Sequence, residues 1–246
     1  MRRALALCLL VLLTVSAGCT SLFGPGEVSD DQLNENATYD DVWQQDAQVY
    51  IDVRSNDYRA VYDLGENRTT LQVFGRNAFG LERPLDISGL RYRFDNGTVV
   101  STDQHANFTV DQGREQLRIT VPEANGTLAF TAPKSGKSFG VPAFIEGVSY
   151  EAALPPKTDV AVPLLSSVDP SPTRTTDEDG RIHIYWDSVS RDVSVRYYLD
   201  RDLLIFGALA GILTVAGIAG ALYYLRQIRE LERRREDVAL DVNREE

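Results

Sequence analysis

A run of 23 residues without a charged side chain, 203–225, lies near the carboxyl end of this 246-residue chain. As an α-helix the run would extend about 34 Å, enough to cross the roughly 30 Å hydrocarbon layer of a bilayer. A buried helix of a globular protein would seldom be apolar on every side and then continue into a basic cluster. We therefore expect one C-terminal transmembrane α-helix, with the preceding residues folded on one side of a membrane.

The flanking charges predict the orientation of this helix. Acidic residues dominate just before it, at Asp200 and Asp202, whereas five arginines follow it: Arg226, Arg229, Arg233, Arg234 and Arg235. The positive-inside rule then places 226–246 in the cytoplasm as a tail and the larger part of the chain outside the cell membrane. Gly207 and Gly211 form a pair of small residues at a spacing that would allow a homodimer through the helix, although glycine is frequent in any spanning helix.

Residues 1–18 have the pattern of a signal peptide. Arg2 and Arg3 precede an apolar run, and small side chains from Ser16 to Gly18 lead to Cys19. Cleavage before Cys19 would expose a thiol that can be lipidated. Bacterial-type lipoboxes usually carry Leu three residues before the cysteine, where this chain has Ser16. The residues around the arginine pair do not fit a twin-arginine signal. The sequence leaves open whether export uses the general secretory or the twin-arginine route.

The predicted ectodomain is strongly acidic. Residues 19–202 hold 29 acidic and 17 basic side chains, a balance of −12, and the whole chain has 22 Arg against 3 Lys. This composition resembles halophilic proteins, although a GC-rich genome also raises Arg over Lys. Molar salt would screen the self-repulsion. Nucleic acid is disfavoured as a partner because a phosphate backbone needs clustered cations.

The part of the chain expected outside the cell has possible glycosylation sites and no pair of cysteines that could form a disulfide. The two cysteines are Cys8, in the leader, and Cys19. Five asparagines are followed two residues later by Thr and are possible N-glycosylation sites: Asn36, Asn67, Asn96, Asn107 and Asn125.

The pattern of polar and apolar residues predicts a polar tether over 19–46 and a β-domain over 47–200. Apolar residues recur at every second position in short segments, starting with Val49, Ile51 and Val53. Asn96-Gly97 predicts a hairpin turn. We expect an all-β antiparallel sandwich of immunoglobulin-like type. Two small β-domains hinged within 154–172 are the alternative, disfavoured because too few strands follow Pro172 to fold alone.

No motif predicts a catalytic, cofactor or metal site. Gly136-Lys137-Ser138 is similar to the end of a phosphate-binding loop but is followed by Pro142 rather than a helix. Asp177-Glu178-Asp179-Gly180 is similar to part of a calcium loop but lacks the closing glutamate, so an acidic turn is expected. His105 and His183 have no second ligand at metal spacing, and His183 is expected as a surface imidazole on a strand.

Several segments together resemble a family of uncharacterised haloarchaeal membrane lipoproteins with a C-terminal transmembrane helix. The similarity is carried by the leader end at Cys19, the Arg-rich tail and four further segments: Tyr58-Arg59-Ala60-Val61-Tyr62-Asp63-Leu64, Asn96-Gly97-Thr98-Val99-Val100, Pro142-Ala143-Phe144-Ile145-Glu146-Gly147 and Val193-Ser194-Val195-Arg196-Tyr197-Tyr198-Leu199. The resemblance implies habitat and architecture, and it implies no activity or functional residue.

The sequence therefore predicts a cell-surface, membrane-anchored lipoprotein whose ectodomain binds or scaffolds, without enzymatic activity or cofactor. Its expected partners are the membrane and other envelope proteins, with which it would form a complex. The alternatives are a membrane-bound extracellular hydrolase or carbohydrate-active enzyme that uses paired carboxylates, and a receptor that signals through its tail.

Overall fold

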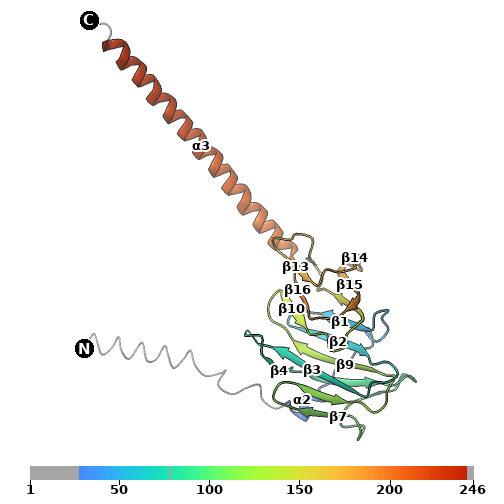
Figure 1. Ribbon diagram of the computed structural model, residues 1–246. Coiled ribbons are helices and arrows are strands. Elements are labelled where there is room, and N and C mark those ends of the chain that lie inside the picture. The colour runs from blue at the N-terminus through green and yellow to red at the C-terminus, as the bar shows by residue number, and fades with distance from the viewer. Residues whose placement is uncertain (1–27, 78, 243–246) are drawn as a thin grey trace, which may run out of the picture. The chain divides into compact units, whose positions relative to one another are not determined.

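The computed structural model describes residues 28–77 and 79–242, with side chains described up to Leu231. The described residues separate into a compact β-domain that ends at Tyr197 and a second unit that starts at Tyr198. Figure 1 shows the stacked strands of the first unit and the single long helix of the second. The second unit consists of the short strand β17 (Tyr198–Leu199) and helix α3 (Asp200–Val242).

The β-domain is built around an eight-stranded main sheet with the order β14-β15-β11-β1-β2-β9-β5-β6. Its strands are β1 (Val49–Val53), β2 (Asp57–Asp63), β5 (Ser88–Arg93), β6 (Val99–Val100), β9 (Thr127–Pro133), β11 (Val148–Ala153), β14 (Arg174–Glu178) and β15 (Arg181–Val189).

Two smaller sheets contribute to the same core as the inner face of the main sheet. One has the order β4-β3-β8-β7 and comprises β3 (Thr70–Arg76), β4 (Glu82–Pro84), β7 (Thr109–Gln112) and β8 (Leu117–Thr120). The other has the order β10-β16-β13 and comprises β10 (Ser138–Val141), β13 (Ser167–Asp169) and β16 (Val193–Arg196). One apolar cluster joins the three sheets, for example through Ile51, Ile119 and Val195. The short strand β12 (Thr158–Asp159) completes the domain.

The mostly β, mostly antiparallel character of the β-domain agrees with the sequence prediction, but the pairing of two central strands does not. β1 and β11 run parallel, with Ile51 opposite Ala152, whereas the other pairs of the main sheet are antiparallel. The long crossover between β1 and β11 is what permits a parallel pair. The strand order of the described sheets does not confirm the predicted immunoglobulin-like sandwich.

The predicted hairpin turn at Asn96-Gly97 is confirmed. It joins β5 to β6, with Arg93 opposite Val99, and Gly97 adopts φ +84°, the left-handed conformation that glycine allows. The segment 154–172 is not a hinge between separate domains, because β15 on its far side pairs with β11 on its near side.

Residues 28–46, which we call the N-terminal strap, correct the prediction of a polar tether up to residue 46. Helix α2 (Asp30–Leu33) begins after Ser29, whose Oγ accepts a hydrogen bond from the backbone N–H of Gln32. Farther along, Tyr39 and Val42 are buried against the outer face of the main sheet. The strap is therefore part of the folded domain, although most of its side chains are polar. The remainder of the predicted tether lies outside the described residues.

Buried tyrosines lead to a prediction for alkaline pH. Burial raises the pKa of Tyr150 to about 12 and also raises the pKa values of Tyr58 and Tyr62. An unfolded tyrosine ionises near pH 10, so these groups favour the fold below that pH, and their contribution is lost as pH rises towards 12. We expect cooperative unfolding in this window, with tyrosinate absorbance and loss of β-sheet circular dichroism appearing together.

Tyr62→Phe serves as the comparison for this titration. The Tyr62 hydroxyl is buried and has no hydrogen-bond partner among the described residues, so its removal sacrifices no hydrogen bond. The variant should unfold at higher pH than the parent. Gradual tyrosine ionisation from pH 10 with an intact sheet would contradict the prediction.

Candidate functional site

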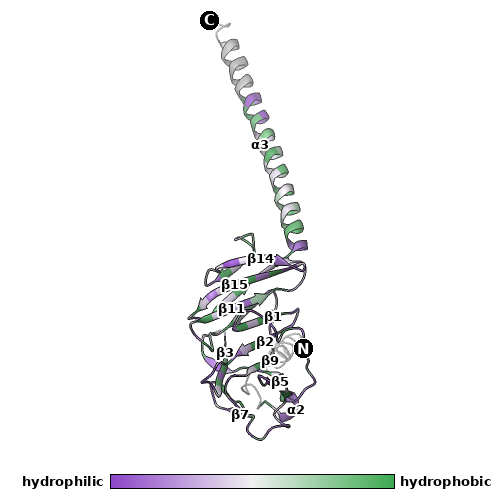
Figure 2. Ribbon diagram, turned by 90° about the vertical axis from the view of Figure 1, so that its right-hand side faces the viewer, coloured by the Kyte–Doolittle hydropathy of each residue, from purple (hydrophilic) through white to green (hydrophobic). Residues whose placement is uncertain are grey.

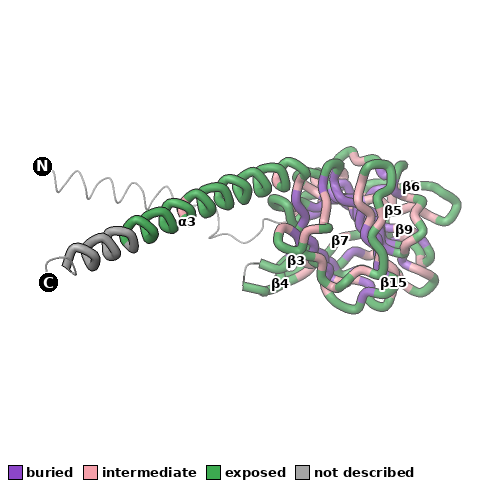
Figure 3. Tube along the Cα trace, turned by 90° about the horizontal axis from the view of Figure 1, so that it is seen from above, coloured by how far each residue is buried: buried purple, intermediate pink, exposed green. Residues whose placement is uncertain are grey.

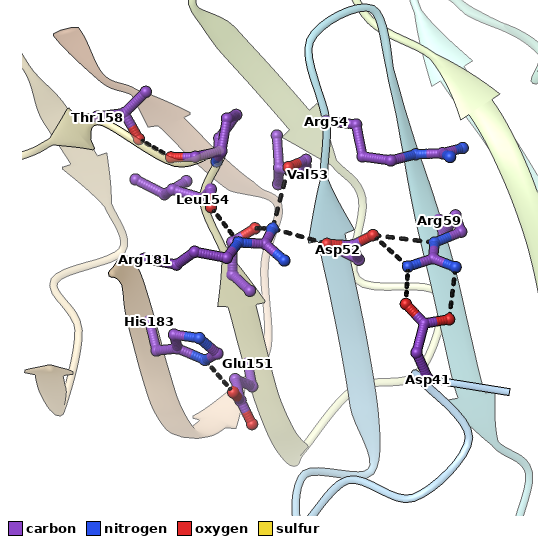
Figure 4. A network of polar contacts seen from close by, with 12 residues as sticks. Asp41, Asp52, Val53, Arg54, Arg59, Glu151, Leu154, Thr158, Arg181 and His183 are labelled. Atoms are coloured by element: carbon purple, nitrogen blue, oxygen red, sulfur yellow. Dashed lines mark hydrogen bonds and ion pairs between the residues drawn. The ribbon is translucent and has the colours of Figure 1, made fainter. Parts of the chain in front are cut away.

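A row of charged side chains crosses the outer face of the main sheet, on the strand positions that alternate with the core residues. Asp52 comes from β1, Arg59 from β2, Glu151 from β11, and Arg181 and His183 from β15 (Figure 4). Four strands from two distant parts of the sequence, β1 with β2 and β11 with β15, thus bring their polar positions into one charged row.

Asp52 is the centre of this row, and only 2% of its side chain is exposed. Arg59 Nε and Nη2 donate to Asp52 Oδ2 at 2.9 and 2.7 Å, and Arg181 Nη2 donates to Oδ1 at 2.6 Å. Arg181 also donates to the carbonyl oxygens of Leu154 and Ala153. Both carboxylate oxygens are therefore in contact with guanidinium groups, as a buried charge requires.

Asp41 links the N-terminal strap to the charged row. Arg59 Nη1 and Nη2 donate to Asp41 Oδ1 and Oδ2 at 2.7 and 2.5 Å, a bidentate geometry. The hydrogen bonds from Arg59 hold the pKa of the Asp41 carboxyl below its usual range. Arg59 thus lies between a buried carboxylate of the sheet and an exposed carboxylate of the strap.

The His183 imidazole is not the surface group that the sequence predicted. Its Nδ1 lies 2.7 Å from Glu151 Oε1, and the two side chains are 14% and 5% exposed. The Tyr185 ring stacks on the imidazole with centroids 6.3 Å apart. His183 does lie on the polar face of its strand, as expected, but that face is partly covered.

The row has the chemistry of a structural network. A general base needs a carboxylate or imidazole that can reach a substrate proton, whereas both Asp52 oxygens are occupied by arginines. Among the described residues, neither Glu151 nor His183 forms a side-chain hydrogen bond with a serine, threonine or cysteine. No group of three potential metal ligands occurs in the part of the chain that the structure describes.

A polar cleft of about 680 Å³ lies between the N-terminal strap and the ends of β2, β5 and β9. Gln32 and Asn36 line it from the strap, and Arg54, Ser88 and Thr131 line it from the sheet. Gln32 is held in place by donating to the Ile87 carbonyl oxygen at 3.0 Å. The cleft offers amide, hydroxyl, guanidinium and carboxylate groups, the last from Glu35, Asp57 and Asp86, which suit a hydrated polar ligand.

The positions predicted from sequence fall into three groups. The five sequon asparagines, Asn36, Asn67, Asn96, Asn107 and Asn125, are all exposed. Gly207 and Gly211 lie on α3, where an added Cβ would meet no atom within 4 Å. Cys19 and the leader lie outside the described residues.

The weaker motifs adopt the structures expected of them. Gly136-Lys137-Ser138 leads into strand β10 and not into a helix, which removes the similarity to a phosphate-binding loop. Asp179-Gly180 forms the turn between β14 and β15, with Glu178 opposite Arg181. His105 lies in a turn, where its Nδ1 accepts a hydrogen bond from the backbone N–H of Asn107 at 3.3 Å.

Sequence reasoning missed the charged row because each member looked like an ordinary exposed strand residue. Asp52 and Arg59 occupy the polar positions of β1 and β2. The only available signal was that such residues recur at polar positions in several strands.

Residues 45–243 match the model of a protein family described as a family of unknown function (DUF5803). No curated protein and no solved structure matches the chain.

Proposed function

We propose that this chain, which belongs to a family of unknown function (DUF5803), is a single-pass surface lipoprotein whose β-domain binds or scaffolds other envelope components. The observation that carries the proposal is that the folded β-domain is followed directly by one helix, Asp200–Leu231, which is long and apolar enough to span a membrane.

The side chains of this helix support membrane anchoring. None of its most apolar window is buried by the rest of the protein, as the exposed surface of α3 in Figure 3 shows. Figure 2 shows hydrophobic residues along most of the same segment. Exposed Leu204, Ile212 and Val215 would be unfavourable in water and favourable in lipid. Tail arginines from Arg226 onward support a cytoplasmic C-terminus.

A binding role is favoured over catalysis by the state of the buried charges. Asp52 and Arg59 neutralise each other, and Glu151 contacts His183, so these groups stabilise the domain. The polar cleft and the exposed loops remain as surfaces for a partner or a polar ligand. The alternative, a hydrolase with paired carboxylates, gains no support from Asp41 and Asp52, because both of these neighbouring carboxylates are held by Arg59.

Lipidation at Cys19, N-glycosylation, a halophilic habitat and a homodimer through Gly207 and Gly211 all belong to the proposal. The acidic balance of residues 19–202 supports the habitat and argues against nucleic acid as a partner. A lipid at Cys19 would add little affinity, because one spanning helix already holds a chain effectively irreversibly. Its effect would be to keep both ends of the β-domain close to the membrane.

Surface proteolysis tests this arrangement. With an epitope tag after Glu246, protease added to intact cells should remove the β-domain and leave a small tagged fragment that alkaline carbonate does not extract. Lysed cells are the control, in which the tag should also be lost. A β-domain that survives on intact cells but is digested after lysis would overturn the orientation. Purification in mild detergent should retain envelope partners, and a bare monomer would argue against the scaffold.

A further inference from the structure

We propose that the end of the β-domain from which the chain enters α3 is a lipid-contact surface, in which the 160–165 loop enters the membrane interface and nearby lysines bind phosphate headgroups. This inference rests on the proposed function in one respect, the anchoring of the chain by α3. It adds the residues that touch lipid and fixes which end of the β-domain faces the membrane.

Strand register places the 160–165 loop at this end of the domain. The loop leads into β13, whose first residue, Ser167, lies opposite Arg196, the last residue of β16. The chain continues from Arg196 to Asp200, the first residue of α3, through four residue steps. Such a link spans at most about 14 Å, so the covalent chain keeps the end of β16 close to the membrane surface.

The loop itself is apolar and exposed. Its sequence, Val-Ala-Val-Pro-Leu-Leu, has no charged or polar side chain. Leu164 is 71% exposed, one of few large hydrophobic side chains in the described β-domain that extend into solvent. Beside the loop is a hollow of about 400 Å³ with Val160, Pro163 and Val168 in its walls. Apolar surface of this kind is stabilised by transfer into the interfacial layer of a bilayer.

Several backbone polar groups of the loop are paired within it or with its neighbours, and the Val160 and Ala161 N–H groups donate to Asp159 Oδ1. The Leu165 and Ser166 N–H groups both donate to the Val162 carbonyl oxygen, at 2.9 and 3.0 Å. Ser166 Oγ lies 2.7 Å from the Val160 carbonyl oxygen and 2.8 Å from that of Val162. Unpaired backbone groups would oppose entry into an apolar layer, so these internal hydrogen bonds favour shallow insertion of the turn.

All three lysines of the chain lie in connections at this end of the β-domain. Lys134 and Lys137 are in the loop between β9 and β10, and Lys157 is between β11 and β12. The Tyr197 N–H donates to the Lys137 carbonyl oxygen at 3.0 Å, and Lys134 Nζ is 5.3 Å from the centre of the Tyr197 ring. Two lysines are thus next to the residue at which the β-domain ends.

These ammonium groups complement the phosphate groups of anionic lipids, towards which lysine extends on a flexible apolar stem. The acidic turn at Asp179 also lies at this end, on the edge hairpin of β14 and β15. Positive charge beside β16 comes from Lys134 and Lys137, whereas Lys157 is close in sequence to the acidic Asp159. A lipid headgroup can use such a local site, whereas a long polyanion would also meet the acidic turn.

The depth of Leu164 can be measured in the full chain. Both native cysteines are replaced by serine, Leu164→Cys carries an environment-sensitive fluorophore, and the protein is reconstituted in vesicles of phosphatidylcholine and phosphatidylglycerol, part of them with brominated acyl chains. We expect bromine quenching at this position to be severalfold stronger than at the control position, Leu81→Cys.

Leu81 is a matched control because it is also apolar and 64% exposed. It lies in the hairpin of β3 and β4, where Arg76 forms an ion pair with Asp192. Asp192 immediately precedes β16, so it marks the end of that strand away from the exit into α3. A fluorophore at Leu81 should therefore remain in water.

The lysines are tested with the triple variant K134Q/K137Q/K157Q in the Leu164→Cys protein. Quenching should fall to the level observed in vesicles of phosphatidylcholine alone. The control R83Q/R114Q/R118Q removes the same charge from exposed positions on β4, on β8 and in the β7–β8 turn, and should change nothing.

The outcomes separate this inference from the proposed function. Protein that fails to float with the vesicles overturns anchoring by α3. Protein that floats, but in which Leu164→Cys is quenched no more than Leu81→Cys, overturns the lipid-contact surface and leaves the anchoring intact. Equal quenching in the lysine variant and its arginine control overturns the headgroup contacts.

Discussion

We expect Asp52→Ala to lower the free energy of unfolding of the β-domain by about 3–5 kcal/mol, the range for breaking a buried ion pair. The substitution leaves Arg59, 13% exposed, and Arg181, 25% exposed, without the carboxylate between them. The loss should lie near the lower limit, because Asp41 still pairs with Arg59 and carbonyl oxygens still accept from Arg181.

Denaturant unfolding of the full chain in detergent, followed by tryptophan fluorescence, measures this loss. Trp186 lies on β15 and Trp43 on the N-terminal strap, so the signal covers both layers around the charged row. Arg191→Ala is the matched control. It breaks a pair with Asp169 in which the side chains are 65% and 67% exposed, and it should cost less than about 1 kcal/mol. Equal losses in the two variants would show that Asp52 is not the centre of a buried network.

The second large effect is expected at the N-terminal strap, where Tyr39→Ala should lower the free energy of unfolding by about 3–5 kcal/mol. Only 1% of Tyr39 is exposed, and its hydroxyl donates to the Gly89 carbonyl oxygen at 2.8 Å. The ring also contacts Trp43 edge-on, with centroids 5.6 Å apart. The variant therefore loses apolar burial, a hydrogen bond and an aromatic contact.

Asp40→Ala is the control for this substitution, because Asp40 is the exposed neighbour of Tyr39 and its removal should change stability by less than about 0.5 kcal/mol. Amide hydrogen exchange adds a local measurement. In the Tyr39→Ala protein the Val42 amide, which donates to the Tyr39 carbonyl oxygen at 2.9 Å, should exchange much faster than in the parent. If residues 28–46 were a tether, the two variants would behave alike.

The sequence was most informative where a single strand has one buried and one polar face. Val49, Ile51 and Val53 marked β1, and Leu117 with Ile119 marked β8, because alternation is visible without knowing the partner strand. The long apolar helix α3 was visible for a similar reason, since the signal of such a helix is local and continuous. The hairpin at Gly97 was encoded by two adjacent residues.

The features that sequence reasoning missed depend on distant contacts. β11 shows no alternation because Tyr150, Glu151, Ala152 and Ala153 are all buried, some by the core and some by the outer face. Asp52 is paired on its second oxygen by Arg181, which is 129 residues away and reaches it across the sheet. The strap looked like a tether because a few apolar residues, chiefly Leu33, Tyr39 and Val42, dock it among many polar ones.

The parallel alignment of β1 and β11 affects the order in which a newly made chain can fold. Ile51 leaves the ribosome roughly a hundred residues before its neighbour Ala152. Until then one edge of β1 has exposed N–H and C=O groups that could pair with another chain. Sequence-distant pairing of this kind slows folding, so the newly made protein passes through an interval in which a chaperone would protect it from aggregation.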